Sequence, residues 1–486
     1  MSVRISEFEL NVYNPLTGDE ITSIELTTNE ELDEIFSKAR KSSNYFNHSK
    51  FSIRKKIIKK FSKSIAAHTE DLIDTICLET GKKEIEALME VFISLEHLRE
   101  SLKNLNDSLG KKSRRSGILK TRKVWIEYEP YGVACIISPW NYPLILTMTP
   151  LIEALLAGNS VILKSSEHTP LTTKLLKKIW DDSTNHSDLL QIVYGTGEIG
   201  RKLVNSKFTD IICFTGSTAI GKMIAQDCAT MFKPLILELG GKDPLIVLPD
   251  ADLERTINAA LWGGMSNAGQ TCISVEHIFV HEAIYSKFIV ELSNKIKNLS
   301  VYENIGAVTV KSGIEKMKSL INENRDSVDI IEGECLGEHF FPPTILINPP
   351  LDSEIMNNEI FGPIMTVNSF NSESEVIKLA NMSGYGLSAS IFGKNKQKMK
   401  FIADRLKVGS ICFNDVLTHY GMADLPFGGF GLSGIGKVHG KEGLRAFSMQ
   451  KSYLSTKVSL KSEFWWFEKR ENFGKLIKKW IKWKYS

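Results

Sequence analysis

The sequence predicts an α/β protein with two parallel sheets in succession, and three observations lead to this fold class. From Gly132 onward, short apolar runs alternate with segments of helical periodicity. The same alternation starts again after Gly240. Before the first sheet, Val124–Tyr128 alternates polar and apolar residues, which is typical of an exposed antiparallel strand. We therefore expect two α/β domains and a small antiparallel element.

The first 110 residues are predicted to be mostly helical after a short extended start. In Asn29-Glu-Glu-Leu, Asn29 is expected to cap a helix whose first turn carries two acidic residues. Four apolar residues then recur at helical spacing and predict a buried helix face: Ile57, Ile58, Phe61 and Ile65.

Short apolar runs after Gly132 are the candidate strands. Because they read as apolar on both faces, we expect parallel sheets covered by helices. The first sheet is assigned Val133–Ile137, Val161–Leu163, Ile192–Tyr194, Ile211–Phe214 and Leu235–Leu237. The second sheet is assigned Leu245–Leu248, His277–Val280, Met365–Val367, Leu387–Ile391 and Ser410–Phe413. The break between the two units falls near Gly240-Gly241.

Composition and charge argue against several classes of function. The net charge of +3 on 486 residues is too small for the whole chain to bind nucleic acid. The seven cysteines form no C-x-x-C pair, which favours a reducing compartment and argues against disulfides or a metal site. Met1–Leu10 has no apolar stretch, so no signal peptide is expected. Tyr131–Ile152 is uncharged, but its three prolines argue against a membrane-spanning helix.

The last residues differ from the rest of the chain. Phe464–Tyr485 contains four tryptophans and a lysine-rich segment. On a helix, one face of that segment would collect Phe473, Leu476, Ile477, Trp480 and Ile481, with the lysines largely elsewhere. Three uses of this basic amphipathic helix stay open: contact of 464–485 with a membrane surface, packing on its own domain, and contact with a partner chain.

Cys272 is the candidate nucleophile. It stands in Gly269-Gln-Thr-Cys-Ile, and an acid, Glu238, stands upstream in Leu237-Glu-Leu-Gly-Gly. A thiolate that attacks a carbonyl carbon needs a base to handle the proton and, later, a water. The alternative for a single cysteine is an inert buried thiol.

Six sequence runs follow one another along the chain: Ser138-Pro-Trp-Asn-Tyr-Pro143, Phe214-Thr-Gly-Ser-Thr-Ala-Ile-Gly221, Leu237-Glu-Leu-Gly-Gly-Lys242, Gly269-Gln-Thr-Cys272, Glu359-Ile-Phe-Gly-Pro363 and Pro426-Phe-Gly-Gly429. In this order they resemble the NAD(P)-dependent aldehyde dehydrogenase superfamily. The resemblance extends from about Tyr13 to about Lys451 and leaves the tail outside.

The resemblance implies a reaction in three parts. Cys272 adds to an aldehyde to form a thiohemiacetal, hydride leaves to the cofactor to give a thioester, and Glu238 activates the water that releases a carboxylic acid. The side-chain amide of Asn141 and the backbone N–H of Cys272 hold the oxyanion. For Asn141 the alternative is a simple turn residue. Because CoA-acylating members lack the base, Glu238 favours hydrolysis over transfer to CoA.

The resemblance also implies the cofactor, which we expect to be NAD. Gly216 lets the chain turn after Phe214, and Ser217 caps the next helix and faces a phosphate. Glu167 accepts from the adenosine ribose and repels a 2′-phosphate, which favours NAD over NADP. The full set expected to hold the cofactor is Trp140, Lys164, Glu167, Phe214, Gly216, Ser217, Glu359 and Phe361.

The substrate is expected to enter an uncharged tunnel, with His419 and Tyr420 at its mouth. The tunnel residues implied by the resemblance are Tyr142, Leu146, Thr149, Ile273 and Phe427. They suit an apolar aliphatic or aromatic aldehyde, and the chain resembles a branch that acts on lipophilic aldehydes, including carotenoid dialdehydes. Two alternatives stay open: a semialdehyde-specific enzyme, such as one for succinate semialdehyde, and a catalytically silent structural relative.

The domain boundaries follow from the same resemblance, which implies the aldehyde dehydrogenase fold with two Rossmann-like domains. We expect an NAD-binding domain over 1–238, with an oligomerisation strand region inserted at 117–131. A catalytic domain over 239–445, an oligomerisation strand over 446–460 and the tail over 461–486 follow. A homodimer or homotetramer is expected, in the cytoplasm or peripheral on a membrane surface.

Overall fold

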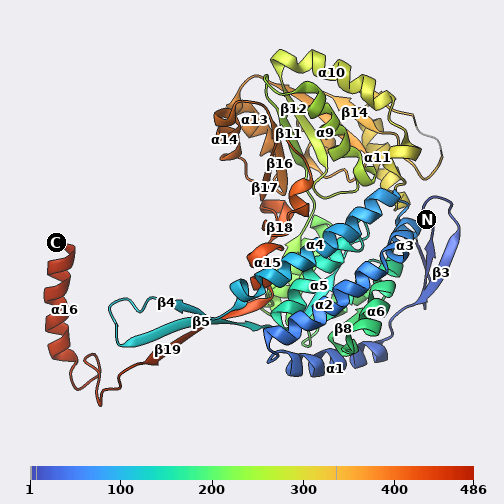
Figure 1. Ribbon diagram of the computed structural model, residues 1–486. Coiled ribbons are helices and arrows are strands. Elements are labelled where there is room, and N and C mark those ends of the chain that lie inside the picture. Colours follow the sequence, from blue (N-terminus) through green and yellow to red (C-terminus); the bar gives the residue numbers. More distant parts are fainter. Residues whose placement is uncertain (1–2, 7, 335–336) are drawn as a thin grey trace. The chain divides into compact units, whose positions relative to one another are not determined.

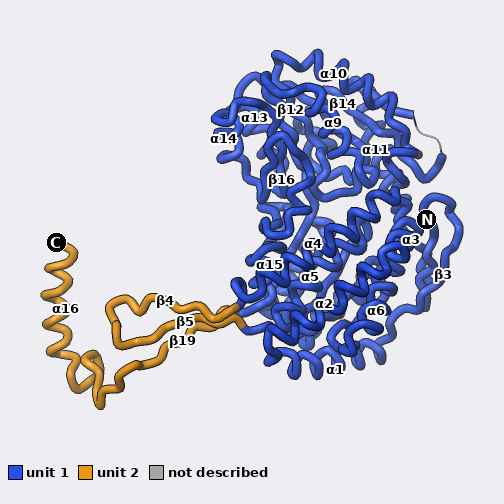
Figure 2. The backbone as a smooth tube through the Cα atoms, in the orientation of Figure 1, with its two compact units in different colours: residues 1–109, 129–449 blue, residues 110–128, 450–486 orange. Residues whose placement is uncertain are grey.

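The computed structural model describes residues 3–6, 8–334 and 337–486, so Cys335 lies outside the described residues. By its contacts the chain divides into two compact units (Figure 2). Unit 1 comprises residues 1–109 and 129–449, and unit 2 comprises residues 110–128 and 450–486. Both parallel sheets belong to unit 1, and the boundary expected at 238/239 stays a prediction.

Unit 1 begins with a small antiparallel sheet of β1 (Val3–Ile5), β2 (Glu9–Tyr13) and β3 (Glu20–Glu25). Four helices follow: α1 (Asn29–Phe46), α2 (Phe51–Ala67), α3 (Thr69–Thr80) and α4 (Glu84–Leu109). The predicted cap of α1 is wrong by one residue, because Thr28 is the N-cap and shares a capping box with Glu31. The predicted apolar face of α2 is confirmed, since all four of its residues are buried.

The first parallel sheet has the strand order β18-β10-β9-β6-β7-β8. Its strands are β6 (Val133–Ile137), β7 (Ser160–Lys164), β8 (Leu190–Val193), β9 (Ile211–Thr215), β10 (Leu235–Glu238) and the short antiparallel β18 (Gly434–Ile435). Its helices are α5 (Ile145–Ala157), α6 (Pro170–Thr184), α7 (Gly197–Asn205) and α8 (Thr218–Thr230). From β6 the chain runs outward through β7 and β8, and then returns to β9 on the other side. The strand order therefore reverses between β6 and β9, which is where open α/β sheets bind ligands.

Helices cover both faces of this sheet. Residues of α1, α7 and α8 share one core cluster with alternate residues of β6 such as Val133, Cys135 and Ile137. α5 is buried along its whole length and contacts β6 and β7. Because successive residues of a strand point to opposite faces, α5 lies on the face away from that cluster. The uncharged stretch 131–152 thus contains a buried strand, a loop and the start of the buried helix α5.

The second sheet has the order β13-β14-β15-β12-β11-β16-β17, with β13 antiparallel. Its strands are β11 (Asp243–Val247), β12 (Val275–His281), β13 (Asp329–Glu332), β14 (Thr344–Ile347), β15 (Ile364–Phe370), β16 (Ser388–Phe392) and β17 (Ser410–Phe413). Its helices include α9 (Leu253–Met265), α10 (Glu282–Lys297), α11 (Lys311–Asn324), α12 (Glu354–Asn357), α13 (Glu373–Ala380) and α14 (Lys396–Ala403) (Figure 1). The helix α15 (Gly440–Ala446) packs instead on α4 and α5.

All ten predicted strands exist, although β8 ends before Tyr194, which was expected to close it. The prediction missed β13, β14 and β18. β18 has only two residues and begins with a glycine, so it carries no apolar run that a sequence pattern could register.

Unit 2 contains a three-stranded sheet in the order β19-β5-β4 and the helix α16. The strands are β4 (Lys112–Arg114), β5 (Arg122–Pro130) and β19 (Ser448–Thr456). The strand expected at 124–128 is confirmed as part of β5. Trp125 stacks on Tyr453 with ring centroids 5.1 Å apart. α16 spans Arg470–Tyr485 and none of its residues is buried.

The segment before α16 is fixed within unit 2 by Arg122. Its guanidinium forms an ion pair of 2.5 Å with Glu463, and both side chains are buried. The same guanidinium lies 5.4 Å from the ring centroid of Trp465. Among the residues that the structure describes, no helix is long and apolar enough to cross a membrane.

Candidate active site

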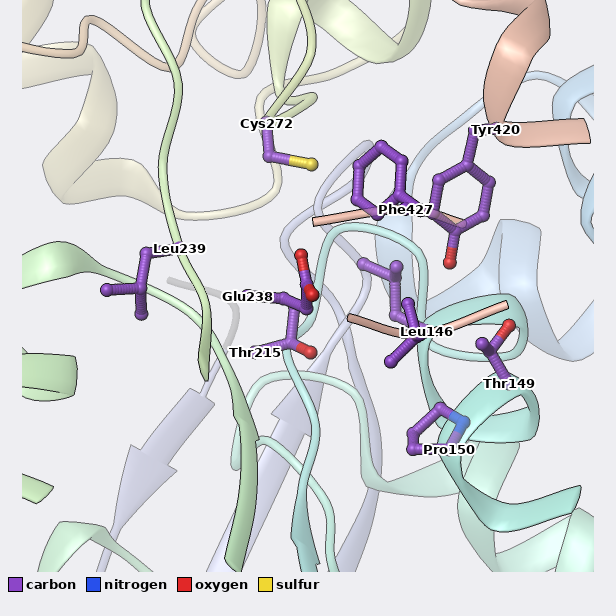
Figure 3. Close-up of a pocket in the computed structure, with 10 residues that line it drawn as sticks. Leu146, Thr149, Pro150, Thr215, Glu238, Leu239, Cys272, Tyr420 and Phe427 are labelled. Carbon is purple, nitrogen blue, oxygen red and sulfur yellow. The ribbon is translucent and has the colours of Figure 1, made fainter. Parts of the chain in front are cut away.

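Cys272 and Glu238 face the same pocket of unit 1 (Figure 3). Cys272 lies between the 3-10 turn η2 (Ser266–Gly269) and β12, and Glu238 is the last residue of β10. The pocket is lined by Leu146, Thr149, Pro150, Thr215, Glu238, Leu239, Cys272, Tyr420, Phe427 and Val438. Two elements that are far apart in the sequence thus bring the predicted nucleophile and the predicted base to one site.

The turn that leads to Cys272 has an unusual backbone. Asn267, Ala268 and Gly269 adopt φ values of 52°, 53° and 68°, which are left-handed and costly for residues other than glycine. A Cβ on Gly269 would lie 2.1 Å from the carbonyl oxygen of Gly362, so no other residue fits there. The side chain of Gln270 secures the turn, donating to Asn267 O at 2.8 Å and accepting from Thr309 N at 2.9 Å. The thiol is therefore presented on a well-anchored loop.

The thiol and the carboxylate are both in a low-dielectric setting. Burial, with the nearby Glu359, raises the pKa of the partly buried Cys272, so its resting form is the neutral thiol. Burial also raises the pKa of Glu238 well above its usual range, against the opposing effect of Lys437. Neither carboxylate oxygen of Glu238 has a hydrogen-bond partner among the described residues. A carboxylate of raised pKa with free oxygens can take a proton from a thiol or a water.

Asn141 is tied to the cysteine loop. It is buried after β6, its Nδ2 donates to Gln270 O at 2.9 Å, and its backbone carbonyl accepts from Lys82 Nζ at 2.7 Å. It does not line the pocket in this structure. An amide nitrogen carries two hydrogens, and one bond to Gln270 leaves the other to serve an oxyanion. That role stays a prediction.

Six of the residues expected to hold the cofactor lie at or just after the carboxyl ends of β6, β7 and β9. Gly216 N donates to Glu238 O at 3.0 Å, and a Cβ on Gly216 would lie 2.5 Å from the ring of Phe214. Ser217 is the N-cap of α8. Lys164 Nζ lies 3.7 Å from Glu167, whose side chain is 30% exposed. This edge of the first sheet adjoins the point where the strand order reverses, so the residues fit a dinucleotide crevice.

Glu359 and Phe361 reach this crevice from the other sheet. Glu359 Oε1 accepts from Gly241 N at 3.1 Å, and burial together with Glu276 raises the pKa of Glu359 to about 8. Phe361 has a φ of 60° and packs edge-to-face on Trp140 at 5.4 Å. The two predicted cofactor residues Trp140 and Phe361 therefore meet directly.

The sequence profile of the Aldehyde dehydrogenase family matches residues 4–453. The chain belongs to the aldehyde dehydrogenase family. A 4,4'-diapolycopene aldehyde oxidase of Methylomonas sp is 34% identical, over 93% of this chain and 87% of its own length. The betaine aldehyde dehydrogenase of Bacillus subtilis is 33% identical, over 92% of this chain and 94% of its own length.

Solved aldehyde dehydrogenase structures have the same fold. A point mutant of betaine aldehyde dehydrogenase from Staphylococcus aureus, in complex with NAD+ and with a BME-modified cysteine, superposes with a TM-score of 0.88. It is 30% identical and covers 94% of this chain, and the match covers 94% of that chain. The predicted family and fold are confirmed.

Only part of the expected substrate tunnel lines the pocket of this aldehyde dehydrogenase. Leu146, Thr149 and Phe427 do, whereas Tyr142 and Ile273 do not. Tyr142 instead shares a hydrogen bond of 2.8 Å with Thr271 Oγ1. Tyr420, expected at the mouth, is part of the wall. The wall residues Pro150, Thr215, Leu239 and Val438 were not predicted.

A buried ion pair behind the site was also missed. Lys242 Nζ lies 2.7 Å from Glu276 Oε2, and neither side chain reaches the solvent appreciably. Glu276 Oε1 also accepts from the backbone N–H groups of Ile360 and Phe361, each at 3.0 Å. The pair thus holds the segment that carries Glu359 and Phe361. Lys242 closes the Leu-Glu-Leu-Gly-Gly-Lys run, but no local pattern points to Glu276.

Proposed function

We propose that this aldehyde dehydrogenase oxidises an apolar aldehyde to the carboxylic acid with NAD, through a thioester on Cys272. The observation that carries the proposal is that Cys272 and Glu238 face one largely apolar pocket, and that Glu238 has no hydrogen-bond partner in the described part of the chain. In a low-dielectric site a carboxylate is a stronger base than in water, and it can first take the thiol proton and later activate water.

The residues act in sequence. Deprotonated Cys272 bonds to the aldehyde carbon, and the N–H donors of the loop and Asn141 stabilise the oxyanion. NAD, held by the residues of the crevice, would supply the acceptor for the hydride that this adduct loses. Glu238 then takes a proton from a water whose oxygen bonds to the acyl carbon, the C–S bond breaks, and the acid leaves. The edge-to-face pair of Trp140 and Phe361 borders the crevice where the nicotinamide end must lie.

The apolar substrate class rests on the pocket wall and on the relatives. A substrate with a second, anionic group would require a lysine or arginine in the pocket. Neither residue type is among the described residues that line it. Similar proteins include the diapolycopene aldehyde oxidase of Methylomonas sp and a 4,4'-diaponeurosporen-aldehyde dehydrogenase of Staphylococcus aureus at 32% identity. Both names describe long apolar aldehydes.

The choice of NAD rests on Glu167. A carboxylate beside the end of β7 accepts from ribose hydroxyls and repels a 2′-phosphate. The similar betaine aldehyde dehydrogenase structure contains NAD+. Other relatives are named as NADP(+) enzymes, so this carboxylate is the residue whose charge decides the preference.

The test is a chain-length series of aldehydes with the purified enzyme, read as NADH formation. We expect activity to rise from acetaldehyde to decanal, because each added methylene group that is buried contributes about 0.8 kcal/mol of binding free energy.

The substitution Cys272→Ser should lower the turnover rate by several orders of magnitude while NAD binding is retained. Normal turnover of that variant would refute the covalent mechanism. Preference for succinate semialdehyde over decanal would refute the substrate class.

We further propose that α16 docks on an anionic lipid surface. Residues 464–485 carry seven lysines and arginines against two glutamates. Leu476 and Trp483 are 62% and 78% exposed. Basic residues attract anionic headgroups, and exposed tryptophans settle at the lipid interface. A lipid surface is also where long apolar aldehydes partition.

For the assembly we propose a homodimer or homotetramer formed through unit 2. The described three-stranded sheet ends in β19 on one side and β4 on the other, and each of these strands presents an edge. Light scattering behind a sizing column tests this directly, and a monomer at micromolar concentration would refute it.

A further inference from the structure

Lys82 and Glu90 form a buried ion pair beside the segment that carries Asn141. Lys82 stands just before α4, and Glu90 lies in the second turn of that helix. Lys82 Nζ lies 2.5 Å from Glu90 Oε1, and the two side chains are 0% and 2% exposed. Taking two charges out of water is costly, and an apolar pair of similar volume is often at least as stable. The pair therefore needs an explanation other than stability.

The pair uses its remaining hydrogen bonds on the backbone between β6 and α5. Lys82 Nζ donates to the backbone carbonyl of Asn141 at 2.7 Å. Glu90 Oε2 accepts from Leu144 N at 3.1 Å and from Ile145 N at 3.3 Å, at the start of α5. The first N–H groups of a helix have no partner within the helix, and a carboxylate is favourable there. The pair thus fixes this backbone at Asn141 and again where α5 begins.

The same part of α4 also holds the cysteine loop. Glu86 lies one turn before Glu90, on the same side of the helix, and accepts from Asn267 N at 2.5 Å. The side-chain amide of Asn267 donates to the carbonyl of Asn141 at 2.9 Å, so this carbonyl accepts from both Lys82 and Asn267. The start of α4 therefore fixes the segment of the predicted oxyanion donor and the left-handed turn before the nucleophile.

A second connection leads from Lys82 to the cysteine loop through Tyr142. The Lys82 ammonium lies 4.1 Å from the centroid of the Tyr142 ring, within the range of a cation–π interaction. The Tyr142 hydroxyl shares a hydrogen bond of 2.8 Å with Thr271 Oγ1, and Thr271 directly precedes Cys272. One ammonium thus contacts both Asn141 and the residue that joins it to the cysteine loop.

The loop that carries Lys82 is itself fixed to the rest of unit 1. Gly81 ends α3 with a φ of 73°, and a Cβ there would lie 2.9 Å from the Cβ of Ala307. Gly81 O accepts from Ala307 N at 3.1 Å, and Thr80 O accepts from Thr309 Oγ1 at 2.7 Å. Because the backbone just before Lys82 is held in this way, the ammonium reaches the site from a fixed base.

We propose that Lys82, held by Glu90, is a positioning residue that orients the Asn141 amide toward the oxyanion, an inference that rests on the proposed function. The Asn141 carbonyl is bound by Lys82, and its side-chain nitrogen donates to Gln270 O at 2.9 Å. With the backbone and the amide both held, the second amide hydrogen is oriented before the substrate arrives. Donors oriented in advance stabilise an oxyanion most, because they need no reorganisation as the charge develops.

The test replaces the pair without leaving a buried charge. In the neutral-pair variant, Lys82→Met with Glu90→Gln, the ammonium is lost, most of the side-chain volume stays, and an amide oxygen can still accept from Leu144 N. With decanal and saturating NAD, kcat/KM should fall by about tenfold or more, because a displacement of about 1 Å can lower a rate about a hundredfold. The Kd of NAD should stay within about twofold of wild type, since the pair contacts no residue of the predicted cofactor set in the described structure.

Asn141→Ala distinguishes positioning from a merely structural role. Removal of one oxyanion donor costs about a hundredfold to a thousandfold in rate. If the pair acts through the Asn141 amide, the neutral-pair substitutions should lower kcat/KM by less than about twofold once that amide is gone. A pair that only packs α4 on α5 would lower kcat/KM by the same factor with Asn141 and without it.

Arg54→Met is the matched control. Arg54 is a buried cation at the opposite end of α5, where it donates to the backbone carbonyls of Leu156 and Ala157. Its effect on kcat/KM should be the same with and without Asn141→Ala, because the two residues share no contact in the described structure.

The inference is overturned if the neutral-pair variant keeps the wild-type kcat/KM, or if it loses the same factor in both backgrounds. Wild-type kcat/KM for Asn141→Ala alone would overturn the oxyanion role of Asn141 and the inference with it, while the thioester on Cys272 would stand. Absence of NADH formation by the wild-type enzyme would instead overturn the proposed function.

Discussion

The ion pair of Lys242 and Glu276 allows a quantitative test of how the site is held. Lys242→Met removes the ammonium but keeps most of the side-chain volume. It leaves the Glu276 carboxylate buried with only the backbone N–H groups of Ile360 and Phe361 as donors. The variant therefore probes whether the pair fixes the segment that carries Glu359 and Phe361.

The expected cost follows from the burial of the pair. Breaking a buried ion pair by removing one partner costs about 3–5 kcal/mol, because an uncompensated charge remains. The two remaining N–H donors place the loss near the lower end, at about 3 kcal/mol. The double variant Lys242→Met with Glu276→Gln leaves no buried charge, and an amide oxygen can still accept from one of these N–H groups. We expect the double variant to recover more than half of the loss.

Urea unfolding followed by tryptophan fluorescence gives the free energies of unfolding, and NAD titration of the native variants gives the effect on the crevice. Lys242→Met should weaken NAD binding, because Phe361 and Glu359 lose their fixed backbone. A loss below about 1 kcal/mol for the single variant, or a double variant less stable than it, would refute the reasoning.

Four further predictions concern Glu238, Glu167 and the helix α16. Because the raised pKa of Glu238 favours its protonated form, steady-state turnover should fall as pH decreases through that pKa, and Glu238→Gln should remove this dependence. The same variant should gain stability relative to wild type as pH rises above the unfolded-state pKa of Glu238, since the unfolded wild type then ionises this acid freely while burial keeps it protonated in the fold; urea unfolding at two pH values checks this. Glu167→Gln should narrow the preference for NAD over NADP by about five- to tenfold in kcat/KM, and a wild type that prefers NADP would contradict the assignment. Truncation after Lys469 removes α16 but retains the Arg122–Glu463 pair; it should abolish sedimentation with phosphatidylserine liposomes, and equal sedimentation of both proteins would exclude the lipid role.

Sequence patterns revealed the parts of the site that are encoded in short contiguous segments of the chain. Cys272 and Glu238 stand in short runs with a recognisable composition, and the parallel strands that carry the site are uninterrupted apolar segments. The helix face of α2 was equally readable, because a buried stripe repeats with the period of the helix.

The roles of residues that depend on a partner far away in the sequence could not be predicted from sequence patterns. Glu276 and Lys242 are 34 positions apart, and Glu90 and Leu144 are 54 positions apart. An acid in a helix gives no hint of which backbone group it will meet. Tyr142 was assigned to the tunnel; it is not among the described residues that line the pocket, and its hydroxyl shares a hydrogen bond with Thr271. The N-cap of α1 is Thr28 and not the predicted Asn29, because the capping box of Thr28 with Glu31 satisfies more backbone N–H groups than Asn29 alone would.

The strand β18 has a consequence for how the enzyme forms during synthesis. It pairs with β10, where Gly434 lies opposite Glu238, and so covers the open edge of the first sheet with residues made almost 200 positions later. Until the ribosome has released that segment, β10 is an uncovered edge that can pair with another nascent chain. The Glu238 carboxylate, the proposed base, therefore receives its final surroundings among the last steps of folding. Cells that make this enzyme in quantity should depend on chaperones that shield strand edges.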